Sequence, residues 1–273
     1  PTWPNHVPLL GGTGFEIEEY PYYDLESHRI DSDRMIEALK QVPAGDLVLL
    51  HGCCHNPTGA DLTHDQWDLI ADLALERGFI PFIDTAYQGL GDGIDEDAYG
   101  MRMMADRLPE VIVASSCSKN FGLYRERTGS ITFITKTPQQ ADIVVSQAMS
   151  TARSIYSMPP AHGALLVSMV LGDPDLNHQW RSELEEVRLR IKAMRVLLCD
   201  SLAGNPAGMD FGHIKHQKGM FSFLGITSSQ IERLREEFGI YIVSSTRINL
   251  AGVNSTNIDL SLIHISEPTR RRG

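Results

Sequence analysis

Short apolar runs alternate with amphipathic stretches along the first half of the chain. The runs have the length of buried strands, and apolar residues occupy both of their faces. Strands of this kind that alternate with helices are typical of a mainly parallel sheet with helices on both faces. We therefore predict an α/β fold with strands at 46–53 (DLVLLHGC), 79–84 (FIPFID), 111–117 (VIVASSC) and 130–135 (SITFIT).

Two helices are predicted between these strands. The first begins after Thr63, which is followed by Gln66 at the spacing of a capping box, and it ends at Gly78. The second covers about 97–107. The face of the first helix that we expect to be buried consists of Trp67, Ile70, Ala71, Ala74 and Leu75.

A long amphipathic helix is predicted over about 177–203, where Leu184, Val187, Ile191, Met194 and Leu198 recur at steps of three and four. A helix of this length is able to join two domains. Beyond it, GMFSFLGI, IERLREEFG, IYIVSS and RINLAG predict a strand, a helix and two further strands, which is a smaller α+β domain.

The domain limits follow from this pattern. We predict a large domain over 1–186 and a small domain over 187–258. Residues 259–273 (DLSLIHISEPTRRRG) lose the periodicity and end in a basic run, so we expect a non-native tail there.

Composition and charge exclude several classes of function. The chain has 24 basic and 35 acidic residues and a formal net charge of −11, which repels nucleic acid. Membrane insertion is not expected, because no apolar run approaches the roughly 18 residues that a spanning helix needs. The 4 cysteines include no CxxC motif and favour a reducing, cytoplasmic compartment.

Polar side chains follow the ends of three predicted strands. In open α/β sheets ligands bind at the carboxyl ends of the strands, so we expect these side chains to form one cluster. They are Asn56 after the first strand, Asp84 and Tyr87 at the second, and Ser116, Ser118, Lys119 and Arg127 after the third.

The chemistry of this cluster suits one cofactor. Partial burial and a neighbouring cation both favour the neutral form of a lysine amine. Lys119 is therefore suited to condense with an aldehyde. Asp84 could form a structural ion pair or keep a pyridine nitrogen protonated. The two serines and Arg127 are groups that hold a phosphate, and Tyr87 and Asn56 could donate to a ring oxygen. Together these groups meet the demands of pyridoxal 5'-phosphate.

The order and spacing of five motifs carry a resemblance to a known family. HNPTG, IDTAYQG, SCSKNFGLYRERTG, YSMPPAHG and STRINLAG resemble those of the class I aspartate and aromatic amino acid aminotransferases of fold type I. The likeness extends from PTWPNH at the start of the chain to about residue 258.

The resemblance implies a role for each matched residue. Lys119 would form the Schiff base and transfer the proton, Asp84 would bind the pyridine nitrogen, and Trp3 would stack on the ring. Tyr87 and Asn56 would bond the ring oxygen, while Ser116, Ser118 and Arg127 would bind the phosphate. Arg247 would bind the substrate α-carboxylate, and Arg153 would reach the distal carboxylate across a homodimer interface.

The implied activity is transamination of aspartate or glutamate with 2-oxo acids, and aromatic substrates stay open. Another fold type I enzyme, such as a lyase, could use the same cofactor groups. The family also has a long segment before PTWP and a helix after residue 258. We therefore expect an incomplete chain that could be an inactive fragment.

A metal site is a weaker hypothesis. His51, Cys53 and His55 alternate on one side of an extended segment and are zinc-type ligands. No second ligand pair at a typical spacing is present in the sequence, so we predict no metal.

Overall fold

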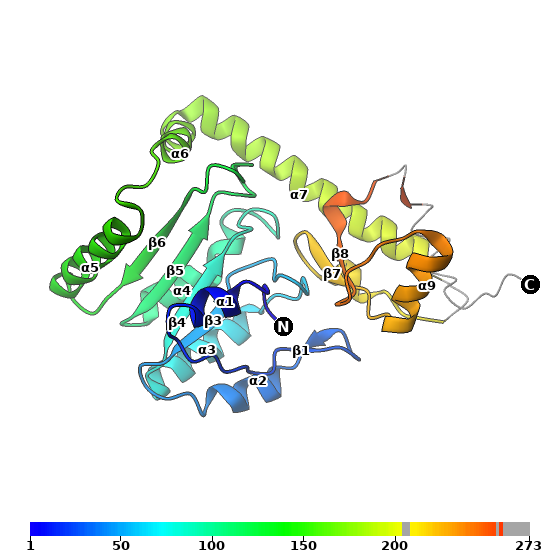
Figure 1. Cartoon of the computed structure of the whole chain (residues 1–273), viewed down its shortest axis with the longest axis horizontal. Helices are drawn as coiled ribbons and strands as arrows, with labels where there is room; N and C mark the ends of the chain where they lie inside the picture. Colours follow the sequence, from blue (N-terminus) through cyan, green and yellow to red (C-terminus); the bar gives the residue numbers. More distant parts are fainter. Residues whose placement is uncertain (204–207, 255–256, 259–273) are drawn as a thin grey trace, which may run out of the picture. The chain divides into compact units, whose positions relative to one another are not determined.

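The computed structural model describes residues 1–203, 208–254 and 257–258, which Figure 1 shows in colour. Contacts divide the chain into two compact units. The sheet unit comprises Ile36–Cys53 and Leu62–Glu186, and the terminal unit comprises Pro1–Met35, Cys54–Asp61 and the described residues from Val187 onward. The predicted domains 1–186 and 187–258 stay a prediction, and the predicted tail at 259–273 lies outside the described residues.

The sheet unit is built on four strands that match the four predicted ones (Figure 1). Their order in the sheet is β3-β4-β5-β6, the same as in the sequence. The first three strands are parallel, whereas β6 runs antiparallel to β5. The bounds are Leu47–His51 for β3, Ile80–Thr85 for β4, Val111–Ser116 for β5 and Gly129–Ile134 for β6.

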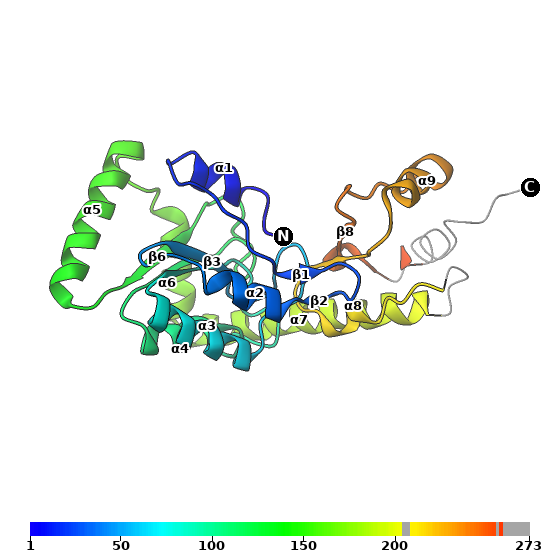
Figure 2. The ribbon, with the colours of Figure 1, turned by 90° about the horizontal axis from the view of Figure 1, so that it is seen from below.

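Helices α3 (His64–Arg77) and α4 (Tyr99–Arg107) lie on one face of this sheet (Figure 2). The side chains of Val48, Ile83 and Val113 alternate toward that face and are buried. The short helix η1 (Glu96–Ala98) leads directly into α4. Burial of apolar side chains between helices and sheet is thus the main source of stability in this unit.

The predicted capping box at the start of α3 and the glycine at its end are confirmed. The Gln66 amide donates to Thr63 Oγ1 at 3.3 Å, the Thr63 amide donates to Gln66 Oε1 at 2.9 Å, and Gly78 ends the helix with φ +79°. Trp67 and Ile70 are buried as predicted, but Leu75 is 52% exposed. Leu75 lies at the edge of the apolar face, where the sheet does not cover it.

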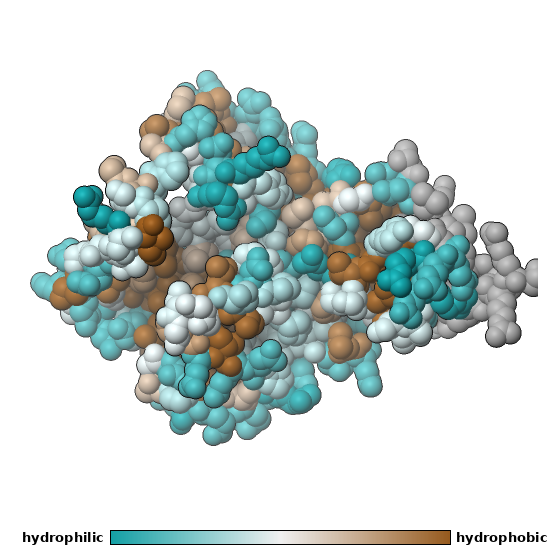
Figure 3. Space-filling model, in the orientation of Figure 1, coloured by the Kyte–Doolittle hydropathy of each residue, from teal (hydrophilic) through white to brown (hydrophobic). Residues whose placement is uncertain are grey.

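Three further helices follow β6 along the chain. They are α5 (Pro138–Tyr156), α6 (His162–Gly172) and α7 (Pro174–Leu202), and α7 contains the predicted long helix. The side chains of α5 include none that is buried, although the helix carries several large apolar residues. Figure 3 shows apolar residues in patches on the visible surface. Among the described residues, no helix combines the length and the apolar character that crossing a membrane requires.

The terminal unit combines segments from both ends of the chain. Strand β7 (Phe221–Phe223) pairs antiparallel with β8 (Arg247–Asn249), and α9 (Ser228–Phe238) lies between them in the sequence. The predicted strand IYIVSS (240–245) is wrong, since none of these described residues is in a strand. Tyr241 and Val243 would lie on the same face of that strand, but both side chains are exposed, so burial does not favour a strand here. The remaining elements are α1 (His6–Gly11), β1 (Tyr23–Asp24), β2 (Arg29–Ile30), α2 (Ser32–Leu39), α8 (His213–His216) and η2 (Leu250–Gly252).

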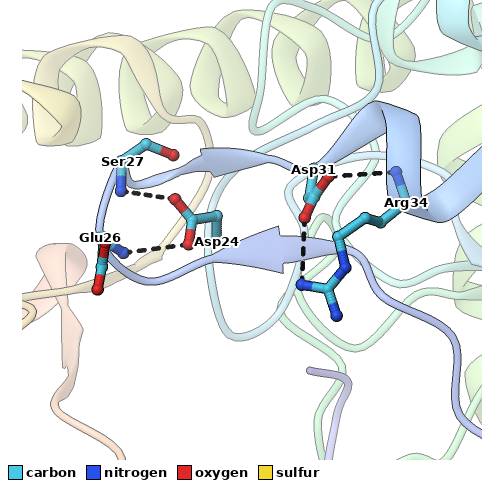
Figure 4. Close-up of polar contacts among 5 residues, drawn as sticks. All are labelled: Asp24, Glu26, Ser27, Asp31 and Arg34. Atoms are coloured by element: carbon cyan, nitrogen blue, oxygen red, sulfur yellow. Dashed lines mark hydrogen bonds and ion pairs between the residues drawn. The ribbon is translucent and has the colours of Figure 1, made fainter.

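Two aspartates shape the β1–β2 hairpin (Figure 4). Asp24 accepts hydrogen bonds from the amides of Ser27 at 2.8 Å and Glu26 at 3.4 Å, which fixes the turn between the strands. Asp31 accepts from the amide of Arg34 at 3.2 Å, at the start of α2. The guanidinium of Arg34 lies 3.5 Å from the same carboxylate. Local side chain to backbone bonds therefore define this hairpin and the helix that follows it.

A buried guanidinium forms the centre of the terminal unit. Arg195 on α7 is 2% exposed, and burial lowers its pKa to about 10. Its nitrogens donate to backbone carbonyls of the segment before and within β7: Ile214 at 3.0 Å, Lys218 at 2.9 Å, Gly219 at 2.8 Å and Phe221 at 2.6 Å. Because a buried charge is tolerated only when it is fully hydrogen-bonded, this set of bonds fixes the course of that segment.

The first prediction concerns Arg195. Arg195→Met should lower the free energy of unfolding by about 3 kcal/mol or more, since the carbonyls are left buried without donors. Arg190→Met is the matched control on the same helix. Arg190 is exposed and donates to the carbonyls of Ala251 and Val253, both at 3.2 Å, so its loss should cost about 1 kcal/mol or less. Urea denaturation measures both, and equal losses would contradict the central role of Arg195.

Two histidines stack in the same unit. The rings of His28 and His213 lie 3.8 Å apart at 13°, and His213 Nε2 donates to the carbonyl of Phe223 at 2.8 Å. Burial lowers the pKa of His213 to about 4, and it also lowers the pKa of His28. The bond to the carbonyl and the charge of Asp210 oppose the shift of His213 only in part. The folded unit therefore holds these rings neutral.

The second prediction follows from the sign of these shifts. Both histidines have folded pKa values below their unfolded value near 6.5, so the unfolded chain binds more protons and stability falls as the pH drops from about 6.5 toward 4. His213→Phe keeps a ring for stacking and should reduce this fall by about 1 to 2 kcal/mol. Urea denaturation at pH 7.5 and pH 4.5 tests it. An equal fall in stability in His213→Phe and in the parent protein would contradict this assignment.

Candidate active site

Asp84 lies near the carboxyl end of the central strand β4. Its register partners are His51 on β3 and Ala114 on β5, so the three strands end at one edge of the sheet. The amide of Gly52 donates to the Asp84 carbonyl at 2.8 Å and extends the ladder past the end of β3. Alternation places the side chain of Asp84 on the sheet face opposite to buried Ile83. This edge carries the predicted polar residues of the sheet unit.

The antiparallel pair β5–β6 explains why Lys119 and Arg127 come together. Ser116 pairs with Gly129, and the amide of Cys117 donates to the carbonyl of Thr128 at 3.0 Å. The chain between these bonds leaves and returns at the same edge of the sheet. Residues that are eight positions apart in the sequence therefore lie on one closed loop.

The amine of Lys119 has a distinct environment. Its Nζ lies 4.8 Å from the centre of the Tyr87 ring, a cation–π contact between the loops that follow β4 and β5. Burial lowers the pKa of the Lys119 ammonium, the negative charge of Asp84 opposes this, and the positive charge of Arg127 adds to it. A larger fraction of neutral amine is therefore present at a given pH than for an exposed lysine.

The residues that we predict to bind phosphate lie along the same loop. Ser118 is 4% exposed, and its amide donates to Ser116 Oγ at 3.1 Å. Arg127 adopts a left-handed backbone conformation with φ +52°, and its side chain is exposed. Its Nη1 donates to the carbonyl of Tyr124 at 3.1 Å. Two hydroxyls and a guanidinium are thus present along one loop, and these groups are donors that suit a phosphate.

The loop that carries Tyr87 is organised by a buried carboxylate. Asp97 is 8% exposed and accepts from the amides of Gly89 at 2.8 Å, Gly91 at 2.9 Å and Asp92 at 2.8 Å. Burial raises the pKa of Asp97, while these hydrogen bonds act in the opposite direction. Tyr87 is 7% exposed, so the packing around its ring holds the ring in place next to Lys119.

Two further predicted residues meet in the terminal unit. Arg247 Nη1 donates to Asn56 Oδ1 at 3.0 Å, although the residues are 191 positions apart. The guanidinium of Arg247 also lies 4.5 Å from the centre of the Phe221 ring. The Asn56 side chain is buried, and Arg247 is half-buried. Arg247 is thus oriented by an amide and an aromatic face, as a residue that binds a carboxylate should be.

The segment that carries Asn56 is fixed from several directions. Asp61 accepts from the amides of Cys54 and His55, both at 2.7 Å, and the ring of Tyr22 stacks on His55 at 4.4 Å. Gly59 has φ +71°, and a Cβ there would lie 2.5 Å from the carbonyl oxygen of Phe221. The HNPTG motif therefore needs glycine at this position for a steric reason.

Trp3 and Arg153 lie on segments other than the loops described above. Trp3, in the terminal unit, contacts the His6 ring edge-on at 5.2 Å. Arg153, in the sheet unit, is exposed in the last turn of α5 instead of lying on the loop of Lys119. Their proposed roles stay predictions.

The sequence predicts no role for Asn120 and Trp180. Asn120 lies beside Lys119, and the indole nitrogen of Trp180 donates to its carbonyl at 2.8 Å. The two residues are 60 positions apart, and Trp180 lies in a predicted helix whose apolar stripe was identified without it. No local pattern in the sequence predicts this contact.

Comparison with known proteins identifies the family. The sequence profile of the family described as "Aminotransferase class I and II" matches residues 1–265. The chain belongs to this family. It is 48% identical over 258 residues to the aspartate aminotransferase of Escherichia coli K12, and 45% identical over 259 residues to an aromatic-amino-acid aminotransferase of Pseudomonas aeruginosa. The predicted family is confirmed.

Solved aminotransferases have the same fold as this chain. An aromatic-amino-acid aminotransferase from Burkholderia pseudomallei, covalently bound to pyridoxal phosphate, matches 99% of the chain with a TM-score of 0.96 and 44% identity. A mitochondrial aspartate aminotransferase from Trypanosoma brucei matches 99% with a TM-score of 0.95 and 38% identity. The chain covers 68% and 71% of those two structures, respectively. The predicted α/β fold is confirmed.

The alignments with these relatives cover most of this chain but a smaller share of each relative. The match to the Escherichia coli and Pseudomonas aeruginosa enzymes covers 94% and 95% of this chain, but 65% of each of those proteins. The chain thus spans about two-thirds of the length of these curated relatives.

Proposed function

We propose that this aminotransferase uses pyridoxal 5'-phosphate to transaminate aspartate or glutamate with 2-oxo acids. The observation that carries the proposal is the amine of Lys119, whose pKa is lowered by burial and which lies against Tyr87 near the charges of Asp84 and Arg127. The similarity to aspartate and aromatic-amino-acid aminotransferases supports the reaction type.

The residues of the sheet edge fit the cofactor. A partly neutral amine suits covalent attachment of an aldehyde, and the carboxylate of Asp84 suits a protonated ring nitrogen. Ser116, Ser118 and Arg127 offer hydrogen-bond donors to a phosphate. When bound, pyridoxal phosphate supplies an electron-withdrawing ring that makes the α-proton of an amino acid acidic.

Each residue then has a defined task. Lys119 would hold the cofactor and accept the proton that leaves the substrate Cα. The hydroxyl of Tyr87 and the amide of Asn56 would donate to the ring oxygen, and Trp3 would stack on the ring. Because burial favours the neutral form of the Lys119 amine, it is suited to take up a proton near neutral pH.

Two arginines are proposed to bind a dicarboxylic substrate. Arg247, oriented by Asn56 and Phe221, would bind the α-carboxylate by a bidentate fork. Arg153 would bind the distal carboxylate from the partner in a homodimer. The unburied helix α5, with exposed Ile143, Met149 and Ile155 around Arg153, supports an interface there. We further propose a cytoplasmic location.

The third prediction is that Lys119 carries the cofactor. The chain is incubated with pyridoxal phosphate, reduced with borohydride and mapped by mass spectrometry, and the label should lie on Lys119. Lys119→Ala should abolish the label. Lys136→Ala is the control, since Lys136 pairs with Glu110 at 3.1 Å at the surface, and it should keep the label. Label on another lysine in the parent protein would overturn the assignment.

The fourth prediction separates the two arginines. Losing a buried charge-assisted contact costs about 2 to 5 kcal/mol, so Arg153→Ala should lower kcat/KM for aspartate by roughly 10²- to 10³-fold. Aromatic substrates, which have one carboxylate, should be affected far less. Arg247→Ala should lower kcat/KM for every amino acid. Steady-state kinetics with aspartate and phenylalanine measure the effect, and equal losses for both in Arg153→Ala would refute this division.

A further inference from the structure

Trp180 on α7 contacts the turn that carries Lys119 in two ways. Its indole Nε1 donates to the carbonyl of Asn120 at 2.8 Å. Its ring stacks on that of Phe121, with centroids 4.3 Å apart and planes at 12°. These residues all belong to the sheet unit, so one indole holds both the backbone and a side chain immediately after Lys119.

The side chain of Asn120 joins the same turn to the loop of Tyr87. Its Nδ2 donates to the carbonyl of Gln88 at 3.2 Å, and Gln88 Nε2 donates to the carbonyl of Ile94 at 2.9 Å. Asn120 Oδ1 is buried and meets no donor among the described residues. The side chain of Asn120 thus holds the turn by one hydrogen bond, whereas Trp180 contacts both the backbone and the Phe121 ring.

We propose that Trp180 is a positioning residue for Lys119, which clamps the Asn120–Phe121 peptide and so holds the lysine amine against Tyr87. The clamp joins α7 to the loops after β4 and β5. Its importance for function rests on the proposed role of Lys119, whereas its effect on the amine does not depend on the cofactor.

The physical basis is the desolvation of the amine. The groups around Lys119 are the Tyr87 ring, the carboxylate of Asp84 and the guanidinium of Arg127. Lys119 is half-exposed, so a small movement of its turn toward solvent would hydrate the ammonium and favour the charged form. A fixed turn keeps the amine partly dry, and its reactivity should therefore depend on Trp180.

The test measures the amine directly. The 273-residue chain is labelled between pH 7 and 11 with a trace of acetic anhydride, which acetylates the neutral form of an amine and not the protonated form. The label on each lysine is quantified by mass spectrometry. Trp180→Phe keeps a ring for stacking on Phe121 but removes the indole donor. We expect its Lys119 to react roughly threefold more slowly at pH 8, because more of the amine is protonated.

Trp67→Phe is the matched control. Trp67 on α3 is also a tryptophan of the sheet unit and is 3% exposed, and it packs against Gly100 instead of the Lys119 turn. It should lower the thermal midpoint without changing the labelling profile of Lys119. Lys136, exposed at the surface, is the internal reference in every sample.

The outcomes are separable. Slower labelling of Lys119 in folded Trp180→Phe, with Trp67→Phe unchanged, supports the clamp, and an unchanged profile overturns it. If Trp180→Phe does not fold, Phe121→Leu, which removes only the stacking partner, decides the question by the same criterion. Borohydride trapping of pyridoxal phosphate in the parent chain tests the proposed function separately, because its failure would remove the cofactor role and leave the labelling comparison intact.

Discussion

The buried guanidinium of Arg195 is the interaction on which the terminal unit depends. It brings the carbonyls of Lys218, Gly219 and Phe221 to one point, and the amide of Lys218 in turn donates to the carbonyl of Gly59 at 2.7 Å. The same two segments present Asn56 and the ring beneath Arg247. A single charge, retained in the interior by backbone oxygens, therefore sets the position of the groups that we propose to bind a substrate carboxylate.

The sheet unit uses a different means to hold its reactive group. There a buried carboxylate, Asp97, gathers the amides of the loop after β4, and Trp180 clamps the loop after β5. Lys119 is held at this place with its ammonium partly desolvated, and Asp84 limits the effect. In both units a side chain bonded to backbone atoms fixes a loop, and the loop presents the chemistry.

The sequence predicted the elements that depend on local signals. The four strands were found from their apolar runs, and α3 was found from Thr63, Gln66 and Gly78, because capping and left-handed termination are encoded within a few residues. The strand at 240–245 was wrong because its apolar content has no partner strand, which is a tertiary property. The sequence also predicted that Lys119 and Asp84 lie at strand ends, where the structure places them, and their functional roles stay predictions. Trp180 and Arg195 were missed, since contacts across tens of residues leave no local pattern.

The antiparallel edge strand has a consequence for protein engineering. The loop from Ser118 to Arg127 is closed at its base by the bond between Cys117 and Thr128, so its two ends stay together whatever lies between them. Closing a longer loop costs only about 0.6 kcal/mol for each doubling of its length. Insertions in this loop away from Lys119, the Asn120–Phe121 segment and Arg127 should therefore be tolerated by the sheet, and this makes the hairpin a suitable place to add residues without redesigning the fold.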